Sequence, residues 1–337
     1  MSSDHRSATP SSSSDISASL YSHTSKSLLS PGLWPVMVTP YHDDGAIDWA
    51  GVDAVTDWYI TAGAGGLFAC CLSSEMYHLS ADERIALVQR VLDRTAGRVP
   101  VVATGNFGGT LEEQIASVQR MSALGVAATV LLPNQLAAQH EPELVLCEAL
   151  ERILDATGDA MLGLYEVPAP YKRIISADTI GWAARTGRFS YLKDTTCEPA
   201  AIRAKLAAAQ GTPLRLYNAW TGGALESLEA GAAGLSPIAA NCYPELFTWL
   251  CANYHAHPEK AQRLQRLLRV LEPAVCVQYV ASAKRVMGLR GVPIGTHCRH
   301  MALEIDAELI VMHESLIEVI EEVLSDYGIQ GVSASLR

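Results

Sequence analysis

Residues 33–40 read Leu-Trp-Pro-Val-Met-Val-Thr-Pro, and this stretch distinguishes two folds that are built on parallel strands. Its first part is nearly all apolar, as is typical of a strand that is buried on both faces. In a doubly wound open sheet, a glycine-rich phosphate loop follows the first strand. Val38-Thr39-Pro40 stands in that place here. The stretch therefore favours a closed barrel over an open sheet.

Seven further strand-like runs follow the first one and alternate with amphipathic segments whose apolar residues recur every three or four positions. Such an alternation is the pattern of repeated βα units around a parallel sheet. The sequence predicts an α/β fold, a TIM (β/α)8 barrel. The predicted strands are 33–39, 66–72, 99–105, 127–132, 160–167, 191–195, 214–219 and 234–238, and helical patterns between them include 81–95, 111–124, 141–156 and 198–209.

The two ends of the chain differ from this repeat. The first 30 residues hold 13 serines and few apolar side chains, so 1–30 is predicted to be a disordered Ser-rich tail. A transit peptide is the alternative, which Asp4, Asp15 and the scarcity of arginine disfavour. Beyond the barrel, assigned to 31–257, three helical patterns without strands predict a C-terminal helical region over 258–337.

Composition excludes several classes of protein. There are 36 Asp and Glu against 25 Lys and Arg, a formal net charge of −11, so no nucleic-acid partner is expected. No apolar run approaches the roughly 20 residues that span a bilayer, and no membrane partner is expected. The eight cysteines form no CxxC pair, which favours free thiols and a cytoplasmic location.

In a TIM barrel, reactive side chains lie at the carboxyl ends of the strands. Lys193 stands within the short predicted strand 191–195. Burial there lowers the pKa of a lysine and yields the neutral amine that attacks a ketone. The competing interpretation is a lysine that pairs with Asp194 or reaches solvent.

Two other strand ends carry hydroxyl groups. Tyr165 ends the fifth strand, where its hydroxyl could carry protons for a reaction at Lys193; a core tyrosine is the competing interpretation. Ser73 and Ser74 follow the second strand, in a turn whose N–H and O–H donors suit a carboxylate. For Glu75 a structural role is preferred.

These segments together resemble the dihydrodipicolinate synthase and N-acetylneuraminate lyase superfamily of Schiff-base-forming class I aldolases. The resemblance extends over about 32–327, the predicted globular part. It is carried by Pro35–Pro40 with Asp43–Asp48, Ser73-Ser74-Glu75, Tyr165-Glu166-Val167-Pro168, Leu192-Lys193-Asp194 and 231–241.

The resemblance implies a role for each of these residues. Lys193 condenses with the ketone of pyruvate or another 2-oxo acid, and Tyr165 carries protons during formation or cleavage of a carbon–carbon bond to an aldehyde. Ser73, together with Ser74, holds the carboxylate, and Ser236 is a further substrate-binding residue. The resemblance also implies a homotetramer. No metal or other cofactor is expected, because the protonated imine is itself the electron sink.

The sequence departs from the family in its predicted proton relay. The relay threonine falls at Leu72 or Ser73, and the tyrosine that a neighbouring subunit supplies in the family falls near Asn134 or Gln135. The relay is therefore absent or rebuilt.

Further departures concern the substrate. Pro170 replaces the arginine that binds aspartate semialdehyde in dihydrodipicolinate synthases, although Lys172 or Arg173 could substitute if the loop bends inward. True 4-hydroxy-tetrahydrodipicolinate synthase activity is therefore a less favoured interpretation.

The acids that bind a sugar chain in sialic-acid lyases are replaced here by Trp220 and Thr221. We therefore expect an aldehyde that is less polar than a sugar, with both residues at its site. The competing interpretation of Trp220 is that it packs against the following helix. Two more interpretations of the whole protein stay open: a 2-keto-3-deoxy sugar-acid aldolase or dehydratase, and a catalytically retired barrel that binds a 2-oxo acid.

Overall fold

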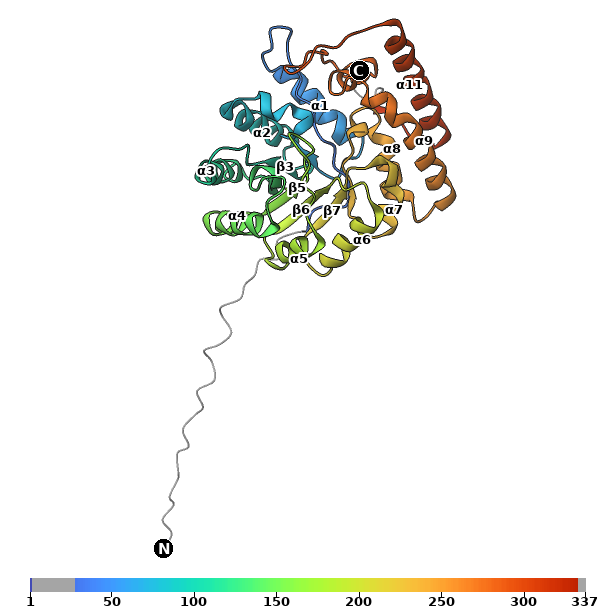
Figure 1. Ribbon diagram of the computed structural model, residues 1–337. Coiled ribbons are helices and arrows are strands. Elements are labelled where there is room, and N and C mark those ends of the chain that lie inside the picture. Colours follow the sequence, from blue (N-terminus) through green and yellow to red (C-terminus); the bar gives the residue numbers. More distant parts are fainter. Residues whose placement is uncertain (2–27, 333–337) are drawn as a thin grey trace.

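Eight parallel strands form one curled sheet with helices around its outside, the predicted TIM barrel (Figure 1). The protein is described by a computed structural model that covers Met1 and residues 28–332. The strands are hydrogen-bonded in the order β1-β8-β7-β6-β5-β4-β3-β2. In chain order they are β1 (Gly32–Leu33), β2 (Leu67–Phe68), β3 (Val101–Thr104), β4 (Ala128–Leu131), β5 (Leu162–Tyr165), β6 (Phe189–Asp194), β7 (Arg215–Asn218) and β8 (Gly234–Leu235).

The seam between β1 and β2 is closed by single hydrogen bonds beyond the regular ladder of β1. Phe68 N donates to Pro35 O, and Met37 N donates to Phe68 O, both at 3.0 Å. The first strand is much shorter than the predicted 33–39. Pro35 has no N–H to donate, so a regular ladder cannot continue through it.

Helices occupy the segments between strands, and their ends agree with capping chemistry. At α2, Ser80 and Glu83 form a reciprocal capping box in which the serine oxygen accepts from Glu83 N and the glutamate accepts from Ser80 N. The helices of the barrel are α1 (Trp49–Thr61), α2 (Ala81–Thr95), α3 (Leu111–Ser122), α4 (Glu143–Ala156), α5 (Ala177–Arg185), α6 (Pro199–Ala208), α7 (Ala224–Glu229) and α8 (Pro244–Asn253).

Three more helices follow the barrel: α9 (Pro258–Cys276), α10 (Ala281–Leu289) and α11 (Ala307–Asp326). They lie beside α8 at one side of the barrel (Figure 1). Leu268 of α9 and Ile320 of α11 belong to the same buried cluster as Phe247 of α8 and Leu235 of β8. The C-terminal helices therefore share a core with the barrel. None of the helices in residues 28–332 combines the length and apolar character that crossing a membrane requires.

Aromatic rings fill the barrel axis. Tyr191 stacks on Tyr217 with 4.9 Å between ring centroids, and Trp34 lies 5.4 Å from Tyr191. Phe68 makes edge contacts with Tyr191 and, at 5.6 Å, with Tyr165. Because side chains two positions apart share one face of a strand, β6 points Tyr191 and Lys193 into the same interior. These rings form an apolar floor below Lys193.

Most of the predicted Ser-rich tail, residues 2–27, lies outside the described residues. Its last residues are described: Leu29 is buried, and the carbonyl of Ser30 accepts hydrogen bonds from Trp34 Nε1 at 3.0 Å and Tyr217 Oη at 2.8 Å. Residues 29–30 therefore pack against the amino-terminal end of the barrel.

Candidate active site

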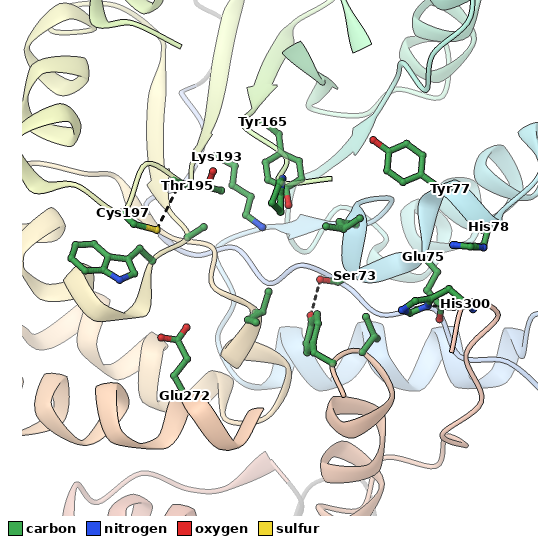
Figure 2. A pocket seen from close by; sticks show the side chains of 17 residues that line it. Ser73, Glu75, Tyr77, His78, Tyr165, Lys193, Thr195, Cys197, Glu272 and His300 are labelled. Carbon is green, nitrogen blue, oxygen red and sulfur yellow. Dashed lines mark hydrogen bonds and ion pairs between the residues drawn. The ribbon is translucent and has the colours of Figure 1, made fainter. Parts of the chain in front are cut away.

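A cavity of about 480 Å³ opens at the carboxyl ends of the strands. Figure 2 shows side chains from the barrel and from the C-terminal helical region pointing into it. Its lining consists of Leu72, Ser73, Glu75, Tyr77, His78, Tyr165, Pro168, Lys193, Thr195, Cys197, Ala219, Trp220, Ile238, Glu272, Tyr279, Val280 and His300.

Lys193 lies at the inner end of this cavity. Its side chain is 2% exposed, and within the described residues its ammonium group has no ion-pair partner. The centroid of the Tyr165 ring lies 4.5 Å from Lys193 Nζ. Burial lowers the pKa of Lys193 to about 8. Asp194 does not pair with it, because the aspartate points to the opposite face of β6 and binds Lys205 instead.

Tyr165 stands beside Lys193 on the neighbouring strand. The two residues are register partners in the β5–β6 ladder, which places both side chains on the inner face. Burial raises the pKa of Tyr165 well above its usual value, so the phenol keeps its proton at neutral pH. A protonated phenol next to an amine can donate a proton to an oxygen or nitrogen formed at that amine.

The two predicted serines have different surroundings. Ser73 lines the cavity, and its Oγ accepts a hydrogen bond from Tyr279 Oη at 2.7 Å. Ser74 does not line the cavity. Its hydroxyl lies 2.6 Å from Met37 O and 2.7 Å from Ala69 O, and it accepts from Cys71 N. Ser74 therefore fixes the turn that presents Ser73.

The predicted residues after β7 and β8 are only partly brought to the cavity. Trp220 lines it and also covers Gly222 and Gly223, where an added Cβ would meet the indole at 2.4 Å. Thr221 is buried beside this turn and does not line the cavity. Ser236 also lies outside the lining, because its hydroxyl donates to Trp34 O at 2.7 Å inside the barrel.

The sequence did not predict the cluster of buried charged side chains that lies behind Tyr165 and Lys193. Glu166 follows Tyr165, and Asp194 follows Lys193, so both carboxylates point outward from the barrel axis. Lys205 of α6 bridges them, with Nζ at 2.5 Å from Glu166 Oε1 and 2.7 Å from Asp194 Oδ2. Burial and the nearby Asp194 raise the pKa of Glu166, while Lys205 opposes the shift. This contact ties the ends of β5 and β6 together.

The C-terminal helical region supplies several lining residues that sequence reasoning missed, among them Tyr279, Val280 and Glu272. Burial raises the pKa of Glu272, and a contact with Thr221 opposes that shift. No local motif marks these residues, because their approach to the cavity depends on how α9 and α10 pack on the barrel.

Glu75 lines the cavity and also contacts the loop after α10. Its carboxylate accepts from Lys284 Nζ at 2.8 Å and from Arg299 N at 2.6 Å. His300 Nδ1 lies 3.0 Å from the same carboxylate. Glu75, Cys298 and His300 are close enough together to be considered as metal ligands. The carboxylate is already held by the Lys284 cation and backbone donors, so its evident role is to fix the loop after α10.

The residues considered as substitutes for missing family positions are engaged elsewhere. Lys172 Nζ donates to Thr195 O at 2.7 Å, and Arg173 Nη2 donates to Glu141 O at 2.8 Å. Asn134 donates to backbone carbonyls, including Tyr171 O at 2.7 Å. Gln135 donates to the hydroxyl of Tyr77, a cavity-lining tyrosine, at 3.3 Å. None of these four residues lines the cavity.

Curated relatives match most of the chain. A 4-hydroxy-tetrahydrodipicolinate synthase of Gluconacetobacter diazotrophicus is 26% identical over 273 residues, 78% of this chain and 88% of the relative. A probable 5-dehydro-4-deoxyglucarate dehydratase of Streptomyces avermitilis is 27% identical over 277 residues, 78% of this chain and 80% of the relative.

Solved structures have the same fold. YagE, a prophage protein of E. coli K12 solved in complex with pyruvate, has a TM-score of 0.78 at 22% identity, covering 86% of this chain and 98% of its own. The dihydrodipicolinate synthase of Thermotoga maritima has a TM-score of 0.78 at 19% identity, covering 87% and 99%. The model of the dihydrodipicolinate synthetase family matches residues 30–320, and the chain belongs to that family.

Proposed function

We propose that the protein is a class I lyase that forms a Schiff base between Lys193 and pyruvate or another 2-oxo acid, and makes or breaks a carbon–carbon bond to an aldehyde. Membership of the family and the relatives' names support an enzyme of the lyase type. The observation that carries the finer proposal is a buried lysine without an ion-pair partner in the described residues, beside a protonated tyrosine in a cavity of substrate size.

The reaction follows from the properties of these groups. The neutral amine of Lys193 attacks the ketone carbon, and the resulting carbinolamine loses water once Tyr165 gives a proton to its oxygen. Loss of a proton from the adjacent carbon converts the iminium ion into an enamine. The enamine carbon bonds to the aldehyde carbon, whose oxygen takes up a proton. Hydrolysis of the imine then releases the product and restores Lys193.

The cavity lining supports an aldehyde without a second carboxylate. In the described part of the chain Lys193 is the one lysine that lines the cavity, and no arginine lines it. Lys172 and Arg173 donate to backbone carbonyls instead. A carboxylate there would lack the charge-assisted contact that usually recognises it. These contacts disfavour 4-hydroxy-tetrahydrodipicolinate synthesis. Trp220 supports an apolar or aromatic aldehyde side.

A sugar-acid substrate also has a basis in the cavity. Glu272 lines the cavity near Trp220 and could accept a hydrogen bond from a hydroxyl group. A dehydratase acting on a deoxy sugar acid is among the relatives. We therefore propose 2-keto-3-deoxy sugar-acid aldolase or dehydratase activity as the second candidate.

The first experiment is borohydride reduction in the presence of pyruvate and then further 2-oxo acids, followed by intact-mass measurement and peptide mapping. We expect one pyruvate-sized adduct on Lys193. Lys193→Ala should abolish the adduct, and Lys260→Ala, which removes a lysine outside the cavity, should keep it. A folded protein that forms no adduct with any 2-oxo acid would instead be a retired barrel.

The aldehyde side is tested with Trp220→Ala and a panel of aldehydes. We expect the variant to lose rate with aromatic aldehydes more than with short hydroxylated ones, because it removes an apolar wall of the cavity. An unchanged order of preference would remove Trp220 from the aldehyde site.

A further inference from the structure

A chain of hydrogen bonds leads from the barrel wall to the carboxylate-binding serine. Tyr59 of α1 donates to Asn241 Oδ1. Asn241 Nδ2 donates to Tyr279 Oη at 2.7 Å, and Tyr279 Oη donates to Ser73 Oγ at 2.7 Å. Tyr59 and Asn241 are fully buried, and Ser73 is nearly so. Figure 2 shows the final bond of this chain at the edge of the cavity.

The direction of the chain is fixed at its inner end. Among the described residues, Asn241 Oδ1 is the acceptor of the Tyr59 hydroxyl proton. A phenol has one proton to give, so Tyr59 gives its own proton to Asn241. If the Asn241 amide were turned over, its NH2 group would face Tyr59, and the Tyr59 proton would lose its acceptor. The Tyr59 hydroxyl thus orients the oxygen of Asn241 toward Tyr59 and its NH2 group toward Tyr279.

The same logic continues outward. Tyr279 accepts from Asn241 and therefore gives its single proton to Ser73. Ser73 uses its oxygen as the acceptor and keeps a proton of its own. No described residue accepts that proton in a hydrogen bond. The Ser73 side chain lines the cavity, so its proton is free to meet a ligand there.

We propose that Tyr279 is a positioning residue that makes Ser73 an obligatory hydrogen-bond donor toward the carboxylate of the 2-oxo acid. The inference rests on the proposed function, since it presumes a 2-oxo acid bound at Lys193. It gives a residue of the C-terminal helical region a role in selecting ligands that carry a carboxylate. Tyr279 acts through Ser73, not by touching the reacting atoms.

The test compares two ketones, pyruvate and acetone, which differ by the carboxylate. Each is trapped on Lys193 by borohydride, and the ratio of their trapping efficiencies measures carboxylate preference. Tyr279→Phe should lower this ratio, because the Ser73 hydroxyl is no longer held as a donor, but by less than the roughly tenfold expected where the hydrogen bond to the charged carboxylate itself is lost. Ser73→Ala should lower it at least as much, and the double variant should lower it no further than Ser73→Ala does.

A second variant does not depend on how Tyr279→Phe folds. In Asn241→Asp both carboxylate oxygens accept, so Tyr279 gives its proton to Asp and must accept from Ser73. Every hydroxyl remains, but the Ser73 proton turns away from the cavity. Asn241→Asp should lower the pyruvate-to-acetone ratio in the wild-type background and leave it unchanged in Ser73→Ala. A loss that persists in Ser73→Ala would mean direct charge repulsion and overturn the proposal.

Tyr327→Phe is the matched control, because it removes a tyrosine hydroxyl that donates to Lys260 O, at 2.9 Å, elsewhere in the C-terminal region. It should keep the wild-type ratio. If Tyr279→Phe also keeps the ratio while pyruvate still labels Lys193, the inference is wrong and the proposed function stands. If neither ketone labels wild-type Lys193, the proposed function itself fails.

Discussion

Lys193 shows how a single residue obtains its chemistry from its surroundings. Its ammonium form loses hydration in the cavity, and no carboxylate within the described residues compensates for that loss. The charged form is therefore disfavoured, which brings the pKa down from 10.5 to about 8. A lysine that paired with Asp194 would keep its charge and react poorly.

The lowered pKa predicts a pH dependence for imine formation. The neutral amine is the reactive form, so its fraction rises with pH through about 8. At low pyruvate, the rate of imine formation should increase about tenfold per pH unit below 7 and level off above about 9. Samples reacted at each pH and quenched into borohydride at one fixed pH measure this rate. A flat profile between pH 6 and 9 would contradict the assigned pKa.

At this scale the sequence was a good guide to which strand ends border the cavity but a poor guide to the positions of individual hydroxyls. Lys193, Tyr165 and Ser73 lie in one cavity. Ser74 and Ser236 are equally close to strand ends, yet both bond to backbone oxygens. Sequence spacing fixes the face of a regular strand, whereas the direction of a hydroxyl in a turn depends on acceptors from distant segments.

Paired strands show how the barrel separates reactive from supporting groups. On both β5 and β6, the inward residue faces the cavity and the next residue carries a buried carboxylate. Lys205 of α6 joins those two carboxylates, Glu166 and Asp194. Alternation along two neighbouring strands thus places a reactive pair on one face and a charged brace on the other.

This brace predicts a large loss of stability. Lys205→Met leaves two buried carboxylates without a cation and should lower the free energy of unfolding by about 3–5 kcal/mol, measured by urea denaturation at pH 7. Arg152→Ala removes an ion pair with Glu112 whose side chains are mostly exposed, so its effect should be far smaller. Equal effects of the two variants would show that the brace contributes no more than a surface pair.

The order of strands and helices could be predicted from the sequence. The residues at which they begin and end could be predicted only where a local motif, such as a capping box, marks them. Helix α2 begins and ends at the predicted residues because a capping box marks its start. All eight predicted strands are found. Seven of them are shorter than the predicted runs, whereas β6 begins two residues before the predicted 191–195 and is longer. Apolar residues continue past the ladder because strand ends are buried too, and Pro35 interrupts the pairing of β1.

The whole molecule builds its cavity from two regions of the chain. The barrel supplies Lys193, Tyr165 and Ser73, while the C-terminal helical region supplies Tyr279. Ser73 and Tyr279 are 206 positions apart. No sequence pattern predicts such a contact, because it depends on the shared core of α8, α9 and α11. The contact of Tyr279 with Ser73 therefore could not be predicted from the sequence.

Because Ser73 and Tyr279 belong to the same chain, we expect activity to survive dissociation of an oligomer into subunits. The resemblance to the family implies a homotetramer, but Tyr279 reaches Ser73 within one subunit. The trapping rate per subunit should therefore stay constant as the protein is diluted through any dissociation detected by sedimentation velocity. A rate that falls in step with loss of oligomer would mean that a neighbouring subunit completes the site.

The lowered pKa of Lys193 also makes this residue reactive toward covalent labels. At neutral pH an ordinary lysine is almost entirely protonated and therefore inert toward electrophiles, whereas about a tenth of Lys193 is uncharged. An amine-directed electrophile small enough for the cavity should mark this one position first. The stoichiometry of such a label counts directly the subunits whose Lys193 amine is reactive.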